Sequence, residues 1–198
     1  MVRADSDIQT LDDLSGHTVS IGAKESGTER NATQILEFAG MPSSLVATKN
    51  LDYIEATKEL KAGDIDAFFC TAGLTTTVID ELSKECDIRL IPLTDTVISK
   101  MLESSSAYTS EVIPAGTYTG QAADISTIGV KSVLITKANV SEDTIEQLTS
   151  LLFEKEKELS YSNSLKLELT YDFATGDIPI PFHDGAKKYY SSCGYSVN

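Results

Sequence analysis

The sequence contains no tryptophan and few residues of the kinds that perform metal or acid–base chemistry. Among its 198 residues are only two histidines, His17 and His183, and three cysteines. Two histidines severely limit metal binding and acid–base catalysis. Cys70, Cys86 and Cys193 have neither the spacing of paired metal ligands nor that of a disulfide framework. The sequence therefore predicts no metal site and no cofactor.

Basic residues are also scarce, and no apolar run is long enough to cross a bilayer. Lysine and arginine total 16 against 30 aspartates and glutamates, which gives a formal net charge of -14 at pH 7. Nucleic acids are therefore poor candidate partners, because their binding depends on neutralising phosphates with cations. A membrane-spanning helix would need about 20 apolar residues in a row. The hydrophobic fraction of 41% is ample for a packed core.

The first residues, from Met1 to Asp5, contain no basic segment followed by an apolar one and no cleavage site. This start predicts no secretory signal in the chain. We expect from it either a cytoplasmic protein or a segment of something longer.

In the first half of the chain, short β-rich runs alternate with amphipathic helical patterns. One such pattern places Ala32, Ile35, Leu36 and Ala39 on a single helical stripe. This alternation is typical of βαβ units, so the sequence predicts an α/β fold with a mostly parallel sheet flanked by helices. The expected strands are 17–22, 45–50, 65–70 and 88–93, and the expected helices are 28–39, 52–62 and 74–84.

After residue 93 the pattern loosens. Residues 101–119 are polar and interrupted by glycine and proline, which predicts mostly loop, and residues 126–136 form a long β-rich run. Three further helices are expected, at 141–159, 165–173 and 185–193.

The sharpest local feature is the segment from Ser20 to Glu29, with the pattern of a strand, a short glycine-containing loop and a helix start. Unpaired N–H groups at a helix start bind carboxylate or phosphate readily, and the Ser26 and Thr28 hydroxyls add donors beside Gly27. The same residues also fit a capping box, with Ser26 as N-cap and Glu29 at N3. The local sequence favours neither interpretation over the other.

Enzymatic interpretations of these residues lack essential groups. Gly22 and Gly27 have the spacing of a P-loop, but Thr28 stands in place of its lysine. Cys70 has no histidine nearby in sequence, and a pairing of Ser26 with His183 has no nucleophile-elbow pattern behind it. We therefore predict that the chain is not an enzyme.

A second candidate loop follows the expected strand 65–70 and has the sequence Cys70-Thr71-Ala72-Gly73-Leu74. Ligands of open α/β sheets lie beyond the carboxyl ends of the strands, so the loops 23–28 and 70–75 could line one cleft. Tyr118 lies in a third, glycine-containing segment and is a candidate wall residue. A tyrosine anchored at the surface is an equally good interpretation of Tyr118.

Seven segments of the chain together resemble a known family. They are IQTLDDLSGHTVSIG, ESGTERNATQIL, AGDIDAFFCTAG, IRLIPL, IPAGTYTGQAADISTIGV, LLFEKEKEL and IPIPFHDGAKKYYSSCG. In this order they resemble the TAXI family of solute-binding proteins, the extracytoplasmic receptors of TRAP transporters. The resemblance implies a type II periplasmic-binding-protein fold, in which two α/β lobes joined by crossover strands close on a ligand. It further implies that residues 6–124 are the second, ligand-binding lobe and that 125–198 are a crossover strand and a C-terminal helical segment.

The resemblance also implies a site and a function. The loop Ser26-Gly27-Thr28 would take the anionic group of a solute, with Thr71, Ala72, Gly73 and Tyr118 around it. The implied function is that of a receptor for a small carboxylate such as glutamate, working with TRAP membrane permease subunits. A ligand-sensing regulatory domain of the same fold is the alternative. Because the resemblance places no first lobe in this chain, we expect self-association or an unusual rearrangement of the C-terminal half, with weak or no solute binding.

Overall fold

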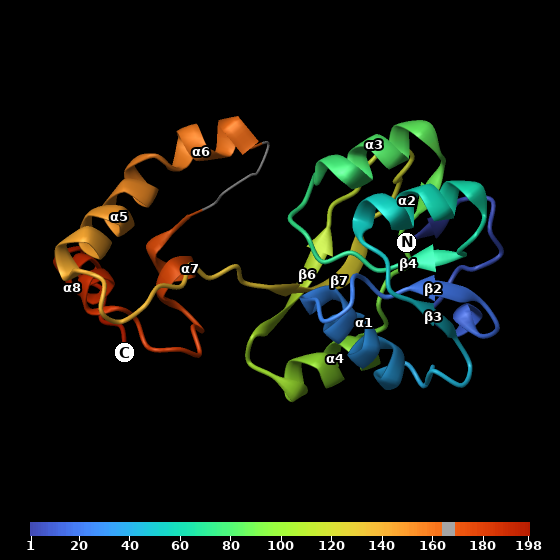
Figure 1. The fold of residues 1–198 in the computed structure, drawn as a ribbon, viewed down its shortest axis with the longest axis horizontal. Helices are drawn as coiled ribbons and strands as arrows, with labels where there is room; N and C mark the ends of the chain where they lie inside the picture. The colour runs from blue at the N-terminus through green and yellow to red at the C-terminus, as the bar shows by residue number, and fades with distance from the viewer. Residues whose placement is uncertain (164–168) are drawn as a thin grey trace. The chain divides into compact units, whose positions relative to one another are not determined.

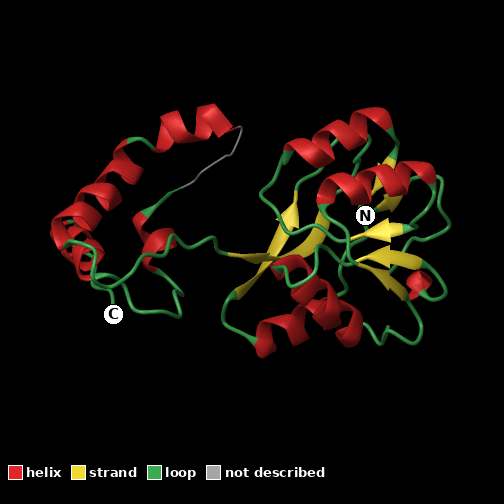
Figure 2. Cartoon of the chain, viewed as in Figure 1, coloured by secondary structure: helices red, strands yellow, loops and turns green. Residues whose placement is uncertain are grey.

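The computed structural model describes residues 1–163 and 169–198, and the chain divides into two compact units, Met1–Gly129 and Val130–Asn198 (Figure 1). The first unit combines helices with a five-stranded sheet, and the second is mainly helical (Figure 2). Among the described residues, every helix is too short or too polar to span a membrane. The predicted domains 6–124 and 125–198 were defined by the lobes of the resembled family and not by compact units of the structure. They stay a prediction.

The first unit is built on a sheet whose strands are short. They are β1 (Val2–Arg3), β2 (Thr18–Ser20), β3 (Ala47–Lys49), β4 (Ala67–Phe68) and β5 (Ile88–Arg89), in the order β3-β2-β4-β1-β5. β2 pairs in parallel with β3 and β4, whereas β1 pairs antiparallel with β4 and β5. β2 to β5 therefore run in one direction and β1 runs against them. This arrangement confirms the predicted α/β class with a mostly parallel sheet, and each of β2 to β5 lies inside a predicted run.

Helices cover both faces of this sheet (Figure 1). α1 (Gly27–Phe38) and α4 (Asp95–Ser104) pack over one face, and α2 (Tyr53–Ala62) and α3 (Thr77–Glu85) over the other. A hydrophobic core lies on each face of the sheet. The same strands contribute side chains to both cores, because successive side chains of a strand point to opposite faces. Ala67 joins the core under α1, and its neighbour Phe68 joins the core under α2. A 3-10 helix, η1 (Asp12–Leu14), places Leu14 in the first of these cores.

The predicted helices α1 and α2 are confirmed, and their ends follow from capping chemistry. α1 buries Ala32, Ile35 and Leu36, as its stripe predicts. α2 begins with a complete capping box, in which the Asp52 side chain accepts from the Glu55 N–H and the Glu55 side chain accepts from the Asp52 N–H. It ends at Gly63, whose φ of 80° suits glycine.

α3 starts at Thr77, three residues later than the predicted helix 74–84. Leu74, at the start of the predicted helix, lies outside α3 and is 44% exposed. Thr75 has a φ of 58°, in the left-handed region, so the chain before Thr76 cannot continue the right-handed helix. The delayed start leaves residues 71–76 as an irregular loop at the end of β4.

The prediction of mostly loop for residues 101–119 is wrong. Part of this range belongs to α4, which buries Val97, Ile98 and Met101 on one face and is capped by Thr94. Part of it forms β6 (Tyr108–Ile113), which pairs with β7 (Ile125–Val130). The glycine- and proline-rich residues that suggested loop are confined to the connection between β6 and β7. β7 also ends at Val130, so the β-rich run expected to reach residue 136 is a strand only in its first half.

The described residues of the second unit form four short helices. They are α5 (Glu142–Glu154), α6 (Glu156–Asn163), α7 (Tyr171–Thr175) and α8 (Asp184–Ser192). The single helix predicted over 141–159 is interrupted at Lys155, within the run Glu154–Glu158, where only charged residues occur and nothing apolar can hold the turn against a core. The terminal helix predicted at 185–193 is confirmed by α8. The helix predicted at 165–173 falls partly outside the described residues.

The core of the second unit is aromatic. Phe153 of α5 stacks on Tyr171 with ring centroids 4.4 Å apart and meets Tyr190 of α8 edge-on at 6.0 Å. α5 and α8 approach closely because Gly185 has no side chain: a Cβ there would lie 2.2 Å from the Glu142 carbonyl oxygen.

Candidate ligand-binding site

The carboxyl ends of three parallel strands bring three loops to one edge of the sheet. Residues 21–26 follow β2, residues 50–52 follow β3, and residues 69–76 follow β4. The Asn50 side chain joins the first two loops by donating to the Gly22 carbonyl at 3.0 Å. Such an edge is the usual ligand site of an open α/β sheet, so the two loops predicted to line one cleft do share an edge.

The first of these loops ends at the N-terminus of α1. The Ser26 hydroxyl accepts from the Glu29 N–H at 3.1 Å, as a cap should, but Glu29 does not complete a capping box. Its carboxylate accepts instead from the Glu25 N–H and from the Asn50 amide. In the described part of the chain, the N–H groups of Gly27 and Thr28 have no hydrogen-bond partner. The helix end is therefore half-capped, and two N–H groups remain available to a ligand.

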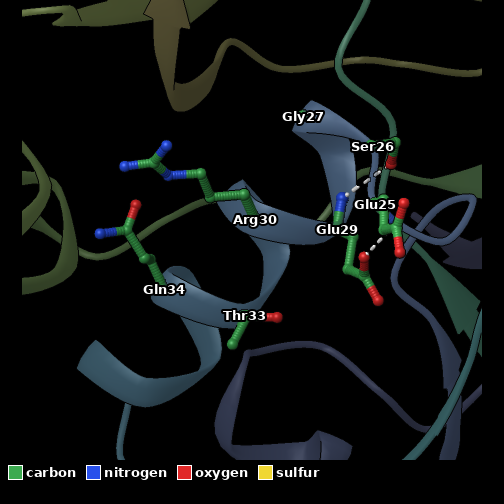
Figure 3. A pocket seen from close by; sticks show the side chains of 7 residues that line it. All are labelled: Glu25, Ser26, Gly27, Glu29, Arg30, Thr33 and Gln34. Atoms are coloured by element: carbon green, nitrogen blue, oxygen red, sulfur yellow. Dashed lines mark hydrogen bonds between the residues drawn. The ribbon is translucent and has the colours of Figure 1, made fainter.

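A hollow of about 520 Å³ opens beside this helix end (Figure 3). The Arg30 and Gln34 side chains extend from one side of α1, and Glu25 and Glu29 lie on the other. Arg30 is exposed and has no ion-pair partner among the described residues. The hollow thus offers a cation and free N–H groups next to two carboxylates. Its lining residues are Glu25, Ser26, Gly27, Glu29, Arg30, Thr33 and Gln34.

Tyr53, the first residue of α2, links the two predicted binding loops. Its hydroxyl lies 2.7 Å from the Thr28 hydroxyl, and it lies 2.9 Å from the carbonyl oxygen and 3.2 Å from the N–H nitrogen of Thr71. Thr28 is 5% exposed and is held by this contact. The structure thereby brings Thr28 and Thr71 together through Tyr53. The only local signal for this residue is its place directly after the helix cap Asp52.

A second chain of polar contacts connects Thr71 to α1 and β6. The Asn31 amide donates to the Thr71 hydroxyl at 3.2 Å, and the Tyr108 hydroxyl lies 2.9 Å from both the Asn31 and the Gln34 side-chain oxygens. Asn31 and Gln34 are one turn apart on α1. Sequence reasoning missed these residues, although two amide side chains at helical spacing beside a buried stripe were a readable signal.

Tyr118 is buried, with 6% of its surface exposed, rather than open to the cleft. Burial raises the pKa of its hydroxyl, which accepts hydrogen bonds from the N–H groups of Thr75 and Thr76. It therefore supports the loop that carries Thr71, Ala72 and Gly73, and direct contact with a ligand stays a prediction. Ala72 and Gly73 are exposed on that loop.

Cys70 is a poor nucleophile in this setting. Burial raises the pKa of its thiol to about 11, so at neutral pH the thiol is protonated and unreactive. Among the described residues, no group of three histidine, cysteine or acidic side chains could hold a metal ion. The polar groups at this edge are suited to hydrogen bonding with a small ligand.

Taken together, the fold and this edge define an α/β protein with a candidate site for a small polar ligand. The chain belongs to the NMT1-like family, whose family model matches residues 1–194. It is also similar to the periplasmic aliphatic sulphonate binding protein SsuA from Escherichia coli, with 17% sequence identity and a TM-score of 0.40. That similarity covers 96% of this chain and 53% of SsuA, so the chain spans about half the length of that protein.

Proposed function

We propose that this chain is part of an extracytoplasmic solute-binding protein, the receptor of a TRAP-type transporter, and that its solute is a small carboxylate such as glutamate. The proposal joins the resemblance to the TAXI family with the polar groups at the carboxyl edge of the sheet. The protein that carries the chain would work outside the cytoplasm and deliver its solute to membrane permease subunits.

One observation carries the proposal of an anionic ligand: the half-capped N-terminus of α1. The unpaired N–H groups of Gly27 and Thr28 lie at the positive end of a helix of 12 residues, where a carboxylate is favoured. Ser26 still has a hydroxyl hydrogen to donate, because its oxygen serves only as acceptor for the Glu29 N–H. Arg30 adds a cation at the same hollow.

The surrounding charge opposes an anion, so these local donors must supply the affinity. The chain has a formal net charge of -14, and Glu25 and Glu29 line the hollow. Long-range repulsion between the protein and an anionic solute slows their encounter and is screened by salt. Short-range hydrogen bonds to the charged ligand act against this repulsion.

The test is to fill the space at Gly27 in the whole protein that carries this chain. A Cβ on Gly27 would meet nothing within 4 Å, so Gly27→Gln is expected to fold normally while its side chain blocks approach to the N–H groups. Isothermal titration calorimetry with L-glutamate and a panel of small carboxylates should show affinity lowered about tenfold or more. Ser99→Gln, at an exposed position of α4, is the matched control and should bind as the unmodified protein does.

Two results would contradict the proposal in different ways. Absence of binding by the unmodified protein to every carboxylate tested would reject the function. Binding that is equally tight in Gly27→Gln would retain a carboxylate receptor but reject the N-terminus of α1 as its site.

A further inference from the structure

The hydroxyl of Tyr53 lies where two loops of the candidate site meet. It contacts the side chain of Thr28, at the start of α1, and both backbone polar groups of Thr71, at the end of β4. We propose that Tyr53 is a positioning residue, which locks these two loops in the geometry that binds solute and makes no contact with the solute itself. The expected effect of Tyr53 on solute binding rests on the proposed function.

The Tyr53 hydroxyl has no hydrogen-bonding capacity left for a ligand. A tyrosine hydroxyl has one hydrogen to donate and two lone pairs that accept. The hydrogen is donated to the Thr71 carbonyl, and one lone pair accepts from the Thr71 N–H. The second lone pair then accepts from the Thr28 hydroxyl. All three capacities of the Tyr53 hydroxyl are filled within the protein.

The hydroxyl groups of Ser26 and Thr28, both predicted as donors to a ligand, have different roles. Because the Thr28 hydroxyl hydrogen is directed to Tyr53, it cannot be donated to a ligand at the same time. Ser26 keeps its hydroxyl hydrogen, since its oxygen only accepts from the Glu29 N–H. The sequence treats Ser26 and Thr28 alike as donors; the structure assigns the ligand to Ser26 and the scaffold to Thr28.

A double-mutant cycle in the free protein tests the lock without any ligand. Tyr53→Phe removes the hydroxyl and keeps the ring, and Thr28→Val removes the partner hydroxyl at nearly constant shape. Amide hydrogen exchange by nuclear magnetic resonance should show the Thr71 N–H exchanging at least tenfold faster in Tyr53→Phe, because water then replaces the lost partner at this exposed loop. Adding Thr28→Val to Tyr53→Phe should accelerate exchange little further, since both changes break one connected unit.

Control variants separate the lock from general destabilisation. Thr28→Ser keeps the hydroxyl and should exchange at Thr71 as the unmodified protein does. Tyr189→Phe also removes a tyrosine hydroxyl that lies 3.2 Å from another hydroxyl, but in the second unit, and should leave Thr71 unaffected. Unchanged exchange at Thr71 in Tyr53→Phe would overturn the proposed lock.

Titration of the same variants with L-glutamate then connects the lock to binding. Tyr53→Phe should bind L-glutamate about tenfold more weakly, with Tyr189→Phe close to the unmodified protein. If Thr71 is unlocked and affinity does not change, the positioning role is refuted. If the unmodified protein binds no L-glutamate, the proposed function fails, while the exchange data still decide whether the lock exists.

Discussion

Replacing Gly22, a buried residue, by alanine should damage the start of α1. Gly22 directly follows β2 and has a φ of 99°, which side chains rarely adopt. An added Cβ would lie 2.7 Å from the Cβ and 2.8 Å from the methyl carbon of Thr28. The substitution therefore combines backbone strain with a collision against the residue that Tyr53 holds in place.

The expected cost can be worked out from these two effects. Forcing a residue with a side chain into left-handed backbone space costs roughly 1–2 kcal/mol. Inserting a methyl group against a well-packed neighbour costs about 1–3 kcal/mol. The free energy of unfolding of the first unit should fall by about 2–5 kcal/mol, a large part of the roughly 5–15 kcal/mol typical of native proteins.

Gly40→Ala provides the control that separates the two effects. Gly40 has a φ of 76°, but a Cβ there would meet nothing within 4 Å. Urea unfolding followed by circular dichroism should show Gly40→Ala losing only about 1–2 kcal/mol, from backbone strain alone. The loss of unfolded-chain freedom on changing glycine to alanine is common to both variants and cancels in the comparison. Equal destabilisation of the two variants would refute the collision between residue 22 and Thr28.

Two further predictions concern the second unit and Cys70. Gly185→Ala should destabilise the second unit by about 3 kcal/mol, at the upper end for overpacking, because the new Cβ would lie 2.2 Å from the Glu142 carbonyl oxygen; hydrogen exchange should accelerate in α5 and α8 while the first unit stays protected, and unchanged exchange in α5 would contradict this. The alkylation rate of Cys70 by iodoacetamide should keep rising up to about pH 11 instead of levelling off near pH 9, because burial favours the neutral thiol. An alkylation rate of Cys70 that levels off near pH 9 would show that the thiol is not buried. Because the pKa of the thiol is higher in the folded state, its contribution to the free energy of unfolding is fully present below pH 9 and is lost as the pH rises past 11.

The sequence determined the four parallel strands well because each is a short apolar run next to an amphipathic helix. The two ends of α2 could be predicted equally well. Asp52 and Glu55 form its capping box and Gly63 ends it, all within one local segment. α4 and β6 were missed because serines, threonines and a nearby glycine- and proline-rich segment mask them. Their apolar residues, such as Val97 and Met101, become meaningful only when packed against β1 and α1.

The candidate site was partly predictable for a similar reason. Loops at strand ends can be located once the strands are known, which is how Ser26 and Thr71 were chosen. Tyr53, Asn31 and Tyr108 act through contacts across 18 to 77 residues of sequence, and no local pattern encodes those distances. The burial of Tyr118 is likewise a property of the assembled unit and not of its own segment.

The antiparallel strand β1 has a consequence for how the first unit assembles. Val2 of β1 pairs with Ala67 of β4 on one side and with Arg89 of β5 on the other. β4 and β5 are therefore connected in the sheet only through β1, which is synthesised much earlier. Closing loops of this length slows folding, because the entropy of the chain is lost before the contacts form. β5 has no other partner among the described strands. The sheet can therefore be completed only after residue 89 has emerged from the ribosome, and until then Val2 can pair with β4 alone.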